Sequence, residues 1–142
     1  MPYRKVAMRT CGNADERVLF ALAKAAFGER PEWDDRRALA ALETDTVFVA
    51  ELSGEPAGYV ALRREDDRLR IEHLVVHPAH VEEAIETQLV EWAEGFAISE
   101  GVESLQVIVQ GDDEVTVGFY RGRGFAPVAP DLLELVLPAR PR

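Results

Sequence analysis

Residues 71–88 read IEHLVVHPAHVEEAIETQ, in which an apolar stretch is followed by a His-Pro pair and then by a helical pattern. Residues 71–76 are rich in branched aliphatic side chains, which is typical of a strand. A strand that leads into a helix start commonly holds phosphate, because free N–H groups and the positive end of the helix dipole converge there. In this chain the first helical turn carries carboxylates instead, at Glu82, Glu83 and Glu86.

The chain before this stretch predicts two helices and then a run of strands. A strand is expected at 3–9, followed by a helix that Asn13 caps, with Glu16 completing a capping box, and that ends near Phe27. A second helix is expected at 33–43. Residues at helical spacing predict the buried faces of the two helices, namely Val18, Leu19, Leu22, Ala25 and Ala26, then Ala38, Leu39 and Leu42. Strands at 47–52, 58–63 and 69–76 are expected to pair antiparallel.

The chain after residue 76 predicts helix, strand, helix and strand. A long helix is expected from about 79 to 100, with an apolar stripe at Ala84, Ile85, Leu89, Trp92, Ala93 and Phe96. A strand follows at 104–109. Asp112 or Asp113 can cap a helix at 114–123, and 132–137 forms a last strand. This order predicts one mixed α/β domain that spans residues 1–142.

Composition narrows the classes of function. The chain has 142 residues, of which 47% are hydrophobic, and its formal net charge is −10. Such a charge disfavours nucleic acid and anionic membrane as partners, and it favours a small amine or a basic peptide. No run of about 20 apolar residues and no secretory signal is present, so we expect a cytoplasmic protein. The single Cys11 cannot form an internal disulfide.

Two motifs in this order resemble the GNAT family of acyl-CoA-dependent N-acetyltransferases. The family pattern L-x-V-x-P at a strand end is matched by Leu74, Val76 and Pro78. The downstream pattern F-Y-x-x-x-G-F is matched in full by 119–125. The resemblance covers roughly residues 47–137. It implies a GNAT-like mixed, mostly antiparallel sheet flanked by about four helices.

The resemblance also implies a cofactor site and a set of catalytic residues. Acetyl-CoA would lie along the backbone of Leu74, Val75 and Val76. Its phosphates would meet the turn formed by Val81, Glu82, Glu83, Ala84, Ile85 and Glu86. Asp113 stands where the family usually carries an Asn. Tyr120 matches the tyrosine that protonates the departing thiolate, and either Glu72 or His73 could take the proton of the amine.

The turn departs from the family pattern Q/R-x-x-G-x-G/A at its three defining positions, which are Val81, Ala84 and Glu86. One carboxylate about 5 Å from a phosphate charge costs about 3 kcal/mol at an effective dielectric near 20. Acidic side chains in a first turn can equally be an ordinary helix start, since each stabilises the helix through its dipole. Both interpretations weaken cofactor binding.

Two functions therefore stay open. One is a catalytically impaired GNAT-like domain that acts as a binding or regulatory module, with no cofactor. The other is an active N-acetyltransferase that transfers acetyl from acetyl-CoA to a small or peptidic amine. A metal site is not expected, because the three histidines at 73, 77 and 80 straddle a strand and a Pro-broken loop. A homodimer is possible through sheet edges.

Overall fold

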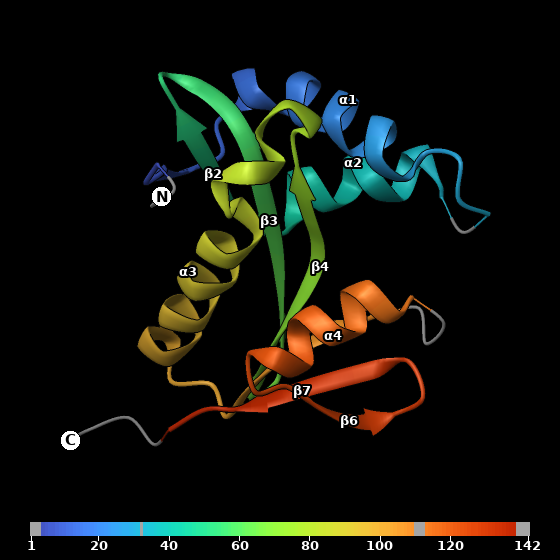
Figure 1. The fold of residues 1–142 in the computed structure, drawn as a ribbon, viewed down its shortest axis with the longest axis vertical. Helices are drawn as coiled ribbons and strands as arrows, with labels where there is room; N and C mark the ends of the chain where they lie inside the picture. The colour runs from blue at the N-terminus through green and yellow to red at the C-terminus, as the bar shows by residue number, and fades with distance from the viewer. Residues whose placement is uncertain (1–3, 32, 110–112, 139–142) are drawn as a thin grey trace. The chain divides into compact units, whose positions relative to one another are not determined.

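A computed structural model describes residues 4–31, 33–109 and 113–138, and for Val81, Glu82 and Glu83 it describes the main chain alone. Four α-helices, two 3₁₀ turns and seven strands follow one another in it (Figure 1). In chain order they are β1 (Ala7–Thr10), η1 (Asn13–Asp15), α1 (Glu16–Phe27), α2 (Asp35–Thr44), β2 (Thr46–Leu52), β3 (Glu55–Glu65), β4 (Arg68–Val76), η2 (Pro78–Glu83), α3 (Ile85–Glu100), β5 (Ser104–Ile108), α4 (Glu114–Gly122), β6 (Ala126–Ala129) and β7 (Leu132–Val136).

The strands form a seven-stranded sheet in the order β1-β2-β3-β4-β5-β7-β6. The pairs β1–β2, β2–β3, β5–β7 and β6–β7 are antiparallel. Strand β5 runs parallel to β4, with Arg68 opposite Ser104 and Ile71 opposite Val107. This mixed, mostly antiparallel sheet with four helices confirms the predicted fold class.

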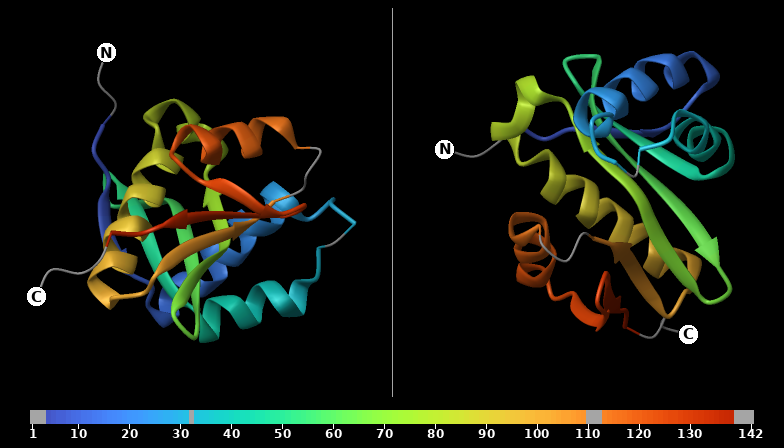
Figure 2. Two further views of the ribbon diagram at one scale, coloured as in Figure 1. Left: turned by 90° about the horizontal axis from the view of Figure 1, so that it is seen from below. Right: turned by 90° about the vertical axis from the view of Figure 1, so that its right-hand side faces the viewer.

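The chain divides into two compact units, of which the first comprises Met1–Leu62 and His73–Trp92. Neighbouring residues of a strand point to opposite faces of a sheet. Tyr59 on β3 belongs to a core cluster with Leu19 of α1 and Leu42 of α2, whereas a Cβ at the preceding Gly58 would contact Ile85 of α3. Helices α1 and α2 therefore cover one face of this unit, and the start of α3 covers the other (Figure 2).

The second unit comprises Arg63–Glu72 and Ala93–Arg142. Its core is built from alternate residues of β5 and β7, together with aromatic side chains at the end of α4. The buried side chains include Leu105, Val107, Tyr120, Phe125 and Leu133. An ion pair between Arg123 and Glu94, with Nη2 and Oε2 3.4 Å apart, links the end of α4 to α3.

The structure corrects the predicted start of the first helix. Asn13 does not cap it, because this residue lies inside η1 and α1 begins at Glu16. Asp15 organises the turn instead, since its carboxylate accepts the Gly12 N–H at 2.8 Å and two hydrogen bonds from Arg9. The Arg9 hydrogen bonds lower the pKa of Asp15 to about 2.

Several predicted core positions on the helices face solvent. Val18 is 50% exposed and Leu39 is 39% exposed, while the buried faces are formed by Leu19, Leu22 and Ala23 on α1 and by Ala38, Ala41 and Leu42 on α2. Trp92 of α3 is also 42% exposed. Ala25 and Ala26 of α1 are exposed as well, so only part of each predicted apolar face is buried.

One further prediction about the elements was wrong, and one strand was missed. The long helix does not begin near residue 79, because η2 and a left-handed residue precede α3, which begins at Ile85. Strand β6 was not predicted at all. The tail after residue 138, Tyr3 and Asp112 lie outside the described residues.

Candidate functional site

The segment between β4 and α3 is a short 3₁₀ turn that a histidine and a proline start. The His77 N–H donates to the carbonyl of Ala57 at 2.7 Å, which ties the end of β4 to β3. The His77 ring then turns back on the chain, and its Nδ1 accepts the N–H of Ala79 at 3.0 Å. Pro78 fits the first position of the turn, because it has no N–H to satisfy there.

Ala84 ends this turn in a left-handed conformation, with φ 52° and ψ 40°. An L-residue other than glycine adopts this region at a cost of roughly 1–2 kcal/mol. The left-handed residue interrupts the helical path, so that η2 and α3 are separate elements. It occupies the position where the GNAT pattern places its first glycine.

The interruption leaves a helix start with free donors. The first bond into α3 runs from the Gln88 N–H to the Ala84 carbonyl at 3.1 Å. The N–H groups of Ile85, Glu86 and Thr87 therefore have no acceptor within the helix. Such donors, together with the positive end of the helix dipole, are the groups with which helix N-termini bind anions in proteins.

Gly58 of β3 supports this helix start through a close approach. A Cβ at position 58 would lie 2.6 Å from the Val75 carbonyl oxygen and 3.2 Å from Cγ2 of Ile85. Only a residue without a side chain lets β3, the end of β4 and the first turn of α3 come this close. Ile85 is itself fully buried, so the helix start is held by the core of the first unit.

The predicted cofactor residues of the first unit fall on two adjoining elements. Leu74, Val75 and Val76 end β4, beyond its registered pairs with β5, which stop at Ile71. Glu86 lies in the first turn of α3 and is half-buried. The side chains of Val81, Glu82 and Glu83 lie outside what the structure describes, so their predicted charge effect on the turn stays a prediction.

The predicted residues of the second unit are placed on α4 and on β4. Asp113 caps α4, as expected, by accepting the Thr116 N–H at 3.2 Å and the Thr116 hydroxyl at 2.8 Å. Tyr120 is 4% exposed. Its ring packs edge-on against Phe119 and Phe125, with centroids 5.1 and 5.2 Å away. The packing interpretation of Tyr120 thus has direct support, and its predicted role as a proton donor stays a prediction.

The two candidate bases differ in their surroundings. Oε1 of Glu72 lies 3.5 Å from Arg63 and 3.9 Å from Arg70, so two guanidinium groups are within ion-pair distance of an oxygen that makes no hydrogen bond among the described residues. Strand alternation places His73 with Val75, which belongs to the core cluster beneath α1 and α2. Of the two candidates, His73 is therefore the one on the face that these helices cover.

The left-handed residue at position 84 was missed by sequence reasoning, as were the donors of Thr87. The only available signal was the Pro78 break after a strand, which indicates a turn but not its handedness.

The rings of His77 and His80 lie 5.3 Å apart. Within the described ranges, no group of three or more metal-ligating side chains comes together, and no helix is long and apolar enough to cross a membrane.

Comparison with solved structures shows the same fold over almost the whole chain. A GCN5-related N-acetyltransferase from Rhodopseudomonas palustris superposes with a TM-score of 0.76 at 21% identity, covering 96% of this chain and 99% of its own. A GNAT acetyltransferase from Brucella melitensis in complex with acetyl-CoA gives 0.75 at 19% identity, covering 96% and 92%. The PaiA N-acetyltransferase from Thermoplasma acidophilum in complex with coenzyme A gives 0.76 at 17% identity, covering 94% and 99%.

Sequence comparison gives the family directly. Among curated proteins, no significant relative of this sequence is found. The sequence model of the acetyltransferase (GNAT) family matches residues 16–125, which include β2 to β5, the turn before α3 and all of α4. With this match over most of its length, the chain belongs to the GNAT family of acetyltransferases.

Proposed function

We propose that the protein is an acetyl-CoA-dependent N-acetyltransferase that acts on a small or peptidic amine. The observation that carries this proposal is the left-handed Ala84, which makes α3 begin at Ile85 and leaves the N–H groups of 85–87 without helical acceptors. A turn that was helical without a break from Pro78 would have given the N–H groups of 85–87 acceptors within the helix. The helix start at Ile85 is what supports anion binding at this loop, although its residues differ from the family pattern.

The residues present fit coenzyme A in two places. The N–H groups of Ile85, Glu86 and Thr87 would hold the pyrophosphate, and the main chain of Leu74–Val76 would pair with the amides of the pantetheine arm. When bound, acetyl-CoA supplies an acetyl group as a reactive thioester. Tyr120 would donate its phenolic proton to the departing sulfur, and His73 or Glu72 would accept a proton from the amine.

A second candidate function is supported by the charge of the loop. Glu86 stands where the family pattern has its second glycine, and Glu82 and Glu83 lie at unspecified positions of the same turn, in which Val81 replaces the basic residue. At about 3 kcal/mol for each close carboxylate, two or three of them could offset the roughly 8 kcal/mol of a micromolar affinity. On this alternative, the protein is a GNAT-fold binding or regulatory module without the cofactor.

Calorimetric titration with acetyl-CoA, at low and at moderate salt, separates the two candidates. Micromolar binding supports the enzyme, and the absence of heat up to millimolar ligand overturns it in favour of the module. In the enzyme, Glu86→Gln should tighten binding by about tenfold, because it removes one charge beside the free donors. Glu100→Gln is the matched control, since it makes the same change at the other end of α3 and should leave binding unchanged.

Turnover then tests the assignment of Tyr120. Tyr120→Phe keeps the ring that packs between Phe119 and Phe125 and removes only the hydroxyl. If the hydroxyl is the proton donor, kcat falls by about 10²-fold or more while the affinity for acetyl-CoA is kept. An unchanged kcat would leave Tyr120 with a packing role alone.

A further inference from the structure

Strand β1 is one of the two edge strands of the sheet, and main-chain groups point outward along its free side. It comes first in the strand order, so β2 is its only neighbouring strand. The Cys11 N–H donates to the Val47 carbonyl of β2 at 2.9 Å. Alternate residues of an antiparallel strand direct their N–H and C=O groups to opposite sides. The main-chain groups of Val6, Met8 and Thr10 therefore point away from β2.

The side chain of Gln88 bonds to this free edge in the way that a neighbouring strand would. Its Oε1 accepts the Val6 N–H at 2.9 Å, and its Nε2 donates to the Arg4 carbonyl at 3.1 Å. The side-chain amide thus takes the place of a peptide group. Beyond Val6 the edge is open, because no group outside the sheet, among the described residues, bonds to the main chain of Met8.

A groove of about 470 Å³ lies beside this edge and is partly apolar. Thr10 lies opposite Phe48 in the β1–β2 pair, and the Phe48 ring packs edge-on against Trp92 of α3, with centroids 5.6 Å apart. The side chain of Met8 is therefore on the face of the sheet that this part of α3 covers. Trp92 is nevertheless 42% exposed. The groove is lined by Lys5, Val6, Met8, Gln88, Glu91 and Trp92, all of the first unit.

We propose that two copies of this chain pair through β1, edge to edge and antiparallel, so that the sheet continues from one copy into the other. A residue that offers both an N–H and a C=O can bond reciprocally with the same residue of a second copy, as a two-fold interface requires. Met8 offers both groups. The other edge strand is β6, and Pro127 within it is typical of an edge that is protected against such pairing.

The groove supplies apolar area that the strand pairing alone lacks. A stable interface buries about 1,200 Å² or more in total, which is more than two short strands provide. In the antiparallel pair the Met8 side chains of both copies lie on the same face of the continued sheet, beside the Trp92 rings. A buried tryptophan contributes about 150–250 Å². The dimer would thus cover the exposed part of Trp92 in each copy.

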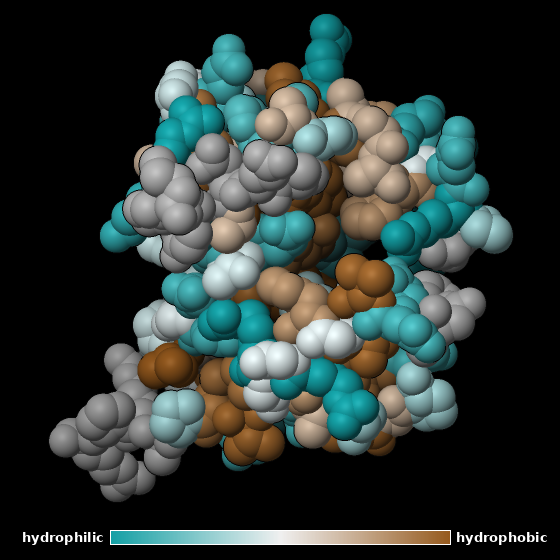
Figure 3. All heavy atoms as spheres, viewed as in Figure 1, coloured by the Kyte–Doolittle hydropathy of each residue, from teal (hydrophilic) through white to brown (hydrophobic). Residues whose placement is uncertain are grey.

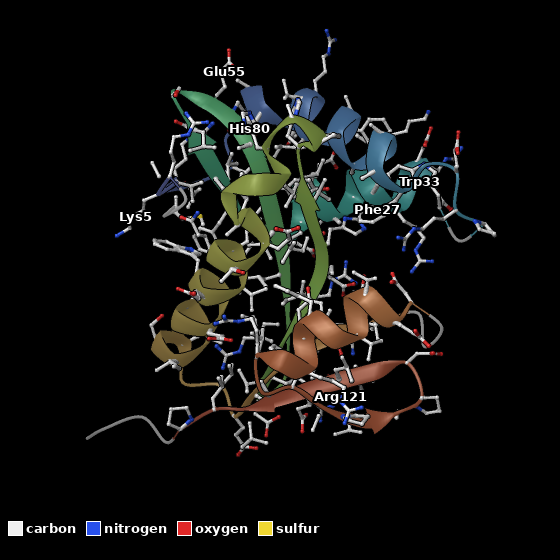
Figure 4. All side chains as sticks on the ribbon, viewed as in Figure 1. Lys5, Phe27, Trp33, Glu55, His80 and Arg121 are labelled. Carbon is white, nitrogen blue, oxygen red and sulfur yellow. The ribbon has the colours of Figure 1, made fainter. Side chains whose placement is uncertain are left out.

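The charges at the rim of the groove favour a second copy as the partner. Lys5 lies on the strand side of the groove and Glu91 on the helix side, and Figure 4 shows Lys5 pointing away from the ribbon. A two-fold axis at the strand edge can bring Lys5 of each copy to Glu91 of the other. The two chains still repel each other at long range, since each carries −10. Salt screens this repulsion, so the dimer should be stronger at moderate than at low salt.

Sedimentation velocity over a dilution series tests the proposal, and we expect a dimer that dissociates in the micromolar range. Trp92→Gln should weaken dimerisation by about tenfold or more. Met8→Pro should abolish it, because proline removes the outward N–H and leaves the bonds between β1 and β2 intact. Val128→Gln is the matched control, since it replaces a 54% exposed apolar side chain on β6 and should leave the dimer unchanged.

The fluorescence of Trp92 gives a second measurement of the same interface. The chain has two tryptophans, and Trp33→Phe leaves Trp92 as the only one. Its emission should shift to shorter wavelength as the dimer forms, and its quenching by acrylamide should fall. With Met8→Pro added, neither change should occur. Circular dichroism and thermal melting establish that each variant is folded.

Each outcome decides the proposal without reference to acetyl-CoA. A monomer at every concentration, or a dimer that Trp92→Gln leaves as strong as before, would overturn it. A dimer that Val128→Gln alone weakens would place the interface at β6 and overturn it as well. If Met8→Pro does not fold, Trp92→Gln decides by itself, because this side chain lies at the surface and its replacement leaves β1 unchanged.

Discussion

At the scale of single residues, Ala84 has a backbone conformation that its residue type disfavours. Its left-handed conformation is one that glycine adopts freely and alanine does not. Ala84→Gly should raise the free energy of unfolding by about 0.5–1 kcal/mol, because the strain removed exceeds the backbone entropy that glycine adds. Urea unfolding measures this. Ala25→Gly, on the exposed side of the helix α1, should lower stability by about as much.

Tyr59 places a polar hydroxyl group in the buried core of the first unit. Its side chain is fully buried, and its hydroxyl finds no hydrogen-bond partner among the described residues. Tyr59→Phe should stabilise the protein by about 1 kcal/mol, because an unsatisfied buried hydroxyl is removed with little change in shape. Tyr120→Phe, the same change at the other buried tyrosine of the described chain, should not stabilise the fold.

Tyr59→Phe should also change how the free energy of unfolding depends on pH in the alkaline range. Burial raises the pKa of Tyr59 above its ordinary value. In the unfolded chain the phenol ionises near pH 10, whereas in the fold it stays protonated, so stability is lost as the pH rises above about 10. The advantage of Tyr59→Phe should therefore grow between pH 9 and pH 11 in urea unfolding. A constant difference would contradict the burial of this hydroxyl.

Residue identity made some of the site predictable. Asp113 was expected at a cap because a short acceptor side chain before a helical pattern has one favourable use there, and the structure confirms it. Ala84 gave no comparable signal, because alanine is the best helix former and the residues around position 84 also predict a helix. The next residue, Ile85, is fully buried beside Gly58, and this tertiary contact has no local sequence signal.

At the scale of elements, Gly58 joins β3 to the start of α3. A methyl group at this position would lie 2.6 Å from the Val75 carbonyl. Gly58→Ala should therefore cost about 2–3 kcal/mol in urea unfolding, as overpacking of a well-packed core does. Gly95→Ala in α3 is the control with the opposite sign, because a Cβ there meets nothing within 4 Å and alanine favours the helix by about 1 kcal/mol. Equal effects of the two changes would refute the close approach.

The element order was predictable because most boundaries carry a chemical signal. Gly28 follows α1, Asp34 caps α2, and the β-branched residues of β2 to β4 lie between turn residues. Strand β6 was missed because all four of its residues are exposed and Pro127 lies within it, so it shows no alternation and carries a strand breaker. Its pairing with β7 is a tertiary contact that no local pattern reveals.

At the scale of the whole molecule, charge sets how an anionic cofactor can approach. The protein carries −10, and hydrophilic side chains are spread among hydrophobic ones over the face drawn in Figure 3. Coenzyme A is itself anionic, so the long-range force between the two is repulsive. The Debye length falls from about 30 Å at 0.01 M salt to about 10 Å at 0.1 M.

Affinity for coenzyme A should therefore rise with salt over this range, by about two- to tenfold, in contrast to a site built from basic residues. Calorimetry at 0.01 and 0.1 M sodium chloride measures it. Pantetheine, which has no phosphate groups, is the control ligand, and its affinity should be independent of salt. A coenzyme A affinity that falls over the same range would mean that local attraction at the helix start outweighs the net charge.

Gln88, whose N–H makes the first bond into α3, also fixes the segment ahead of β1 through its side chain. Its Oε1 accepts the N–H of Val6 at 2.9 Å and its Nε2 donates to the carbonyl of Arg4 at 3.1 Å, across 82 and 84 residues of chain. The segment ahead of β1 is thus fastened by a residue that the ribosome adds more than eighty residues later. Until that residue has emerged from the ribosome, the segment at residues 4–6 lacks these two hydrogen bonds and stays accessible to chaperones and proteases.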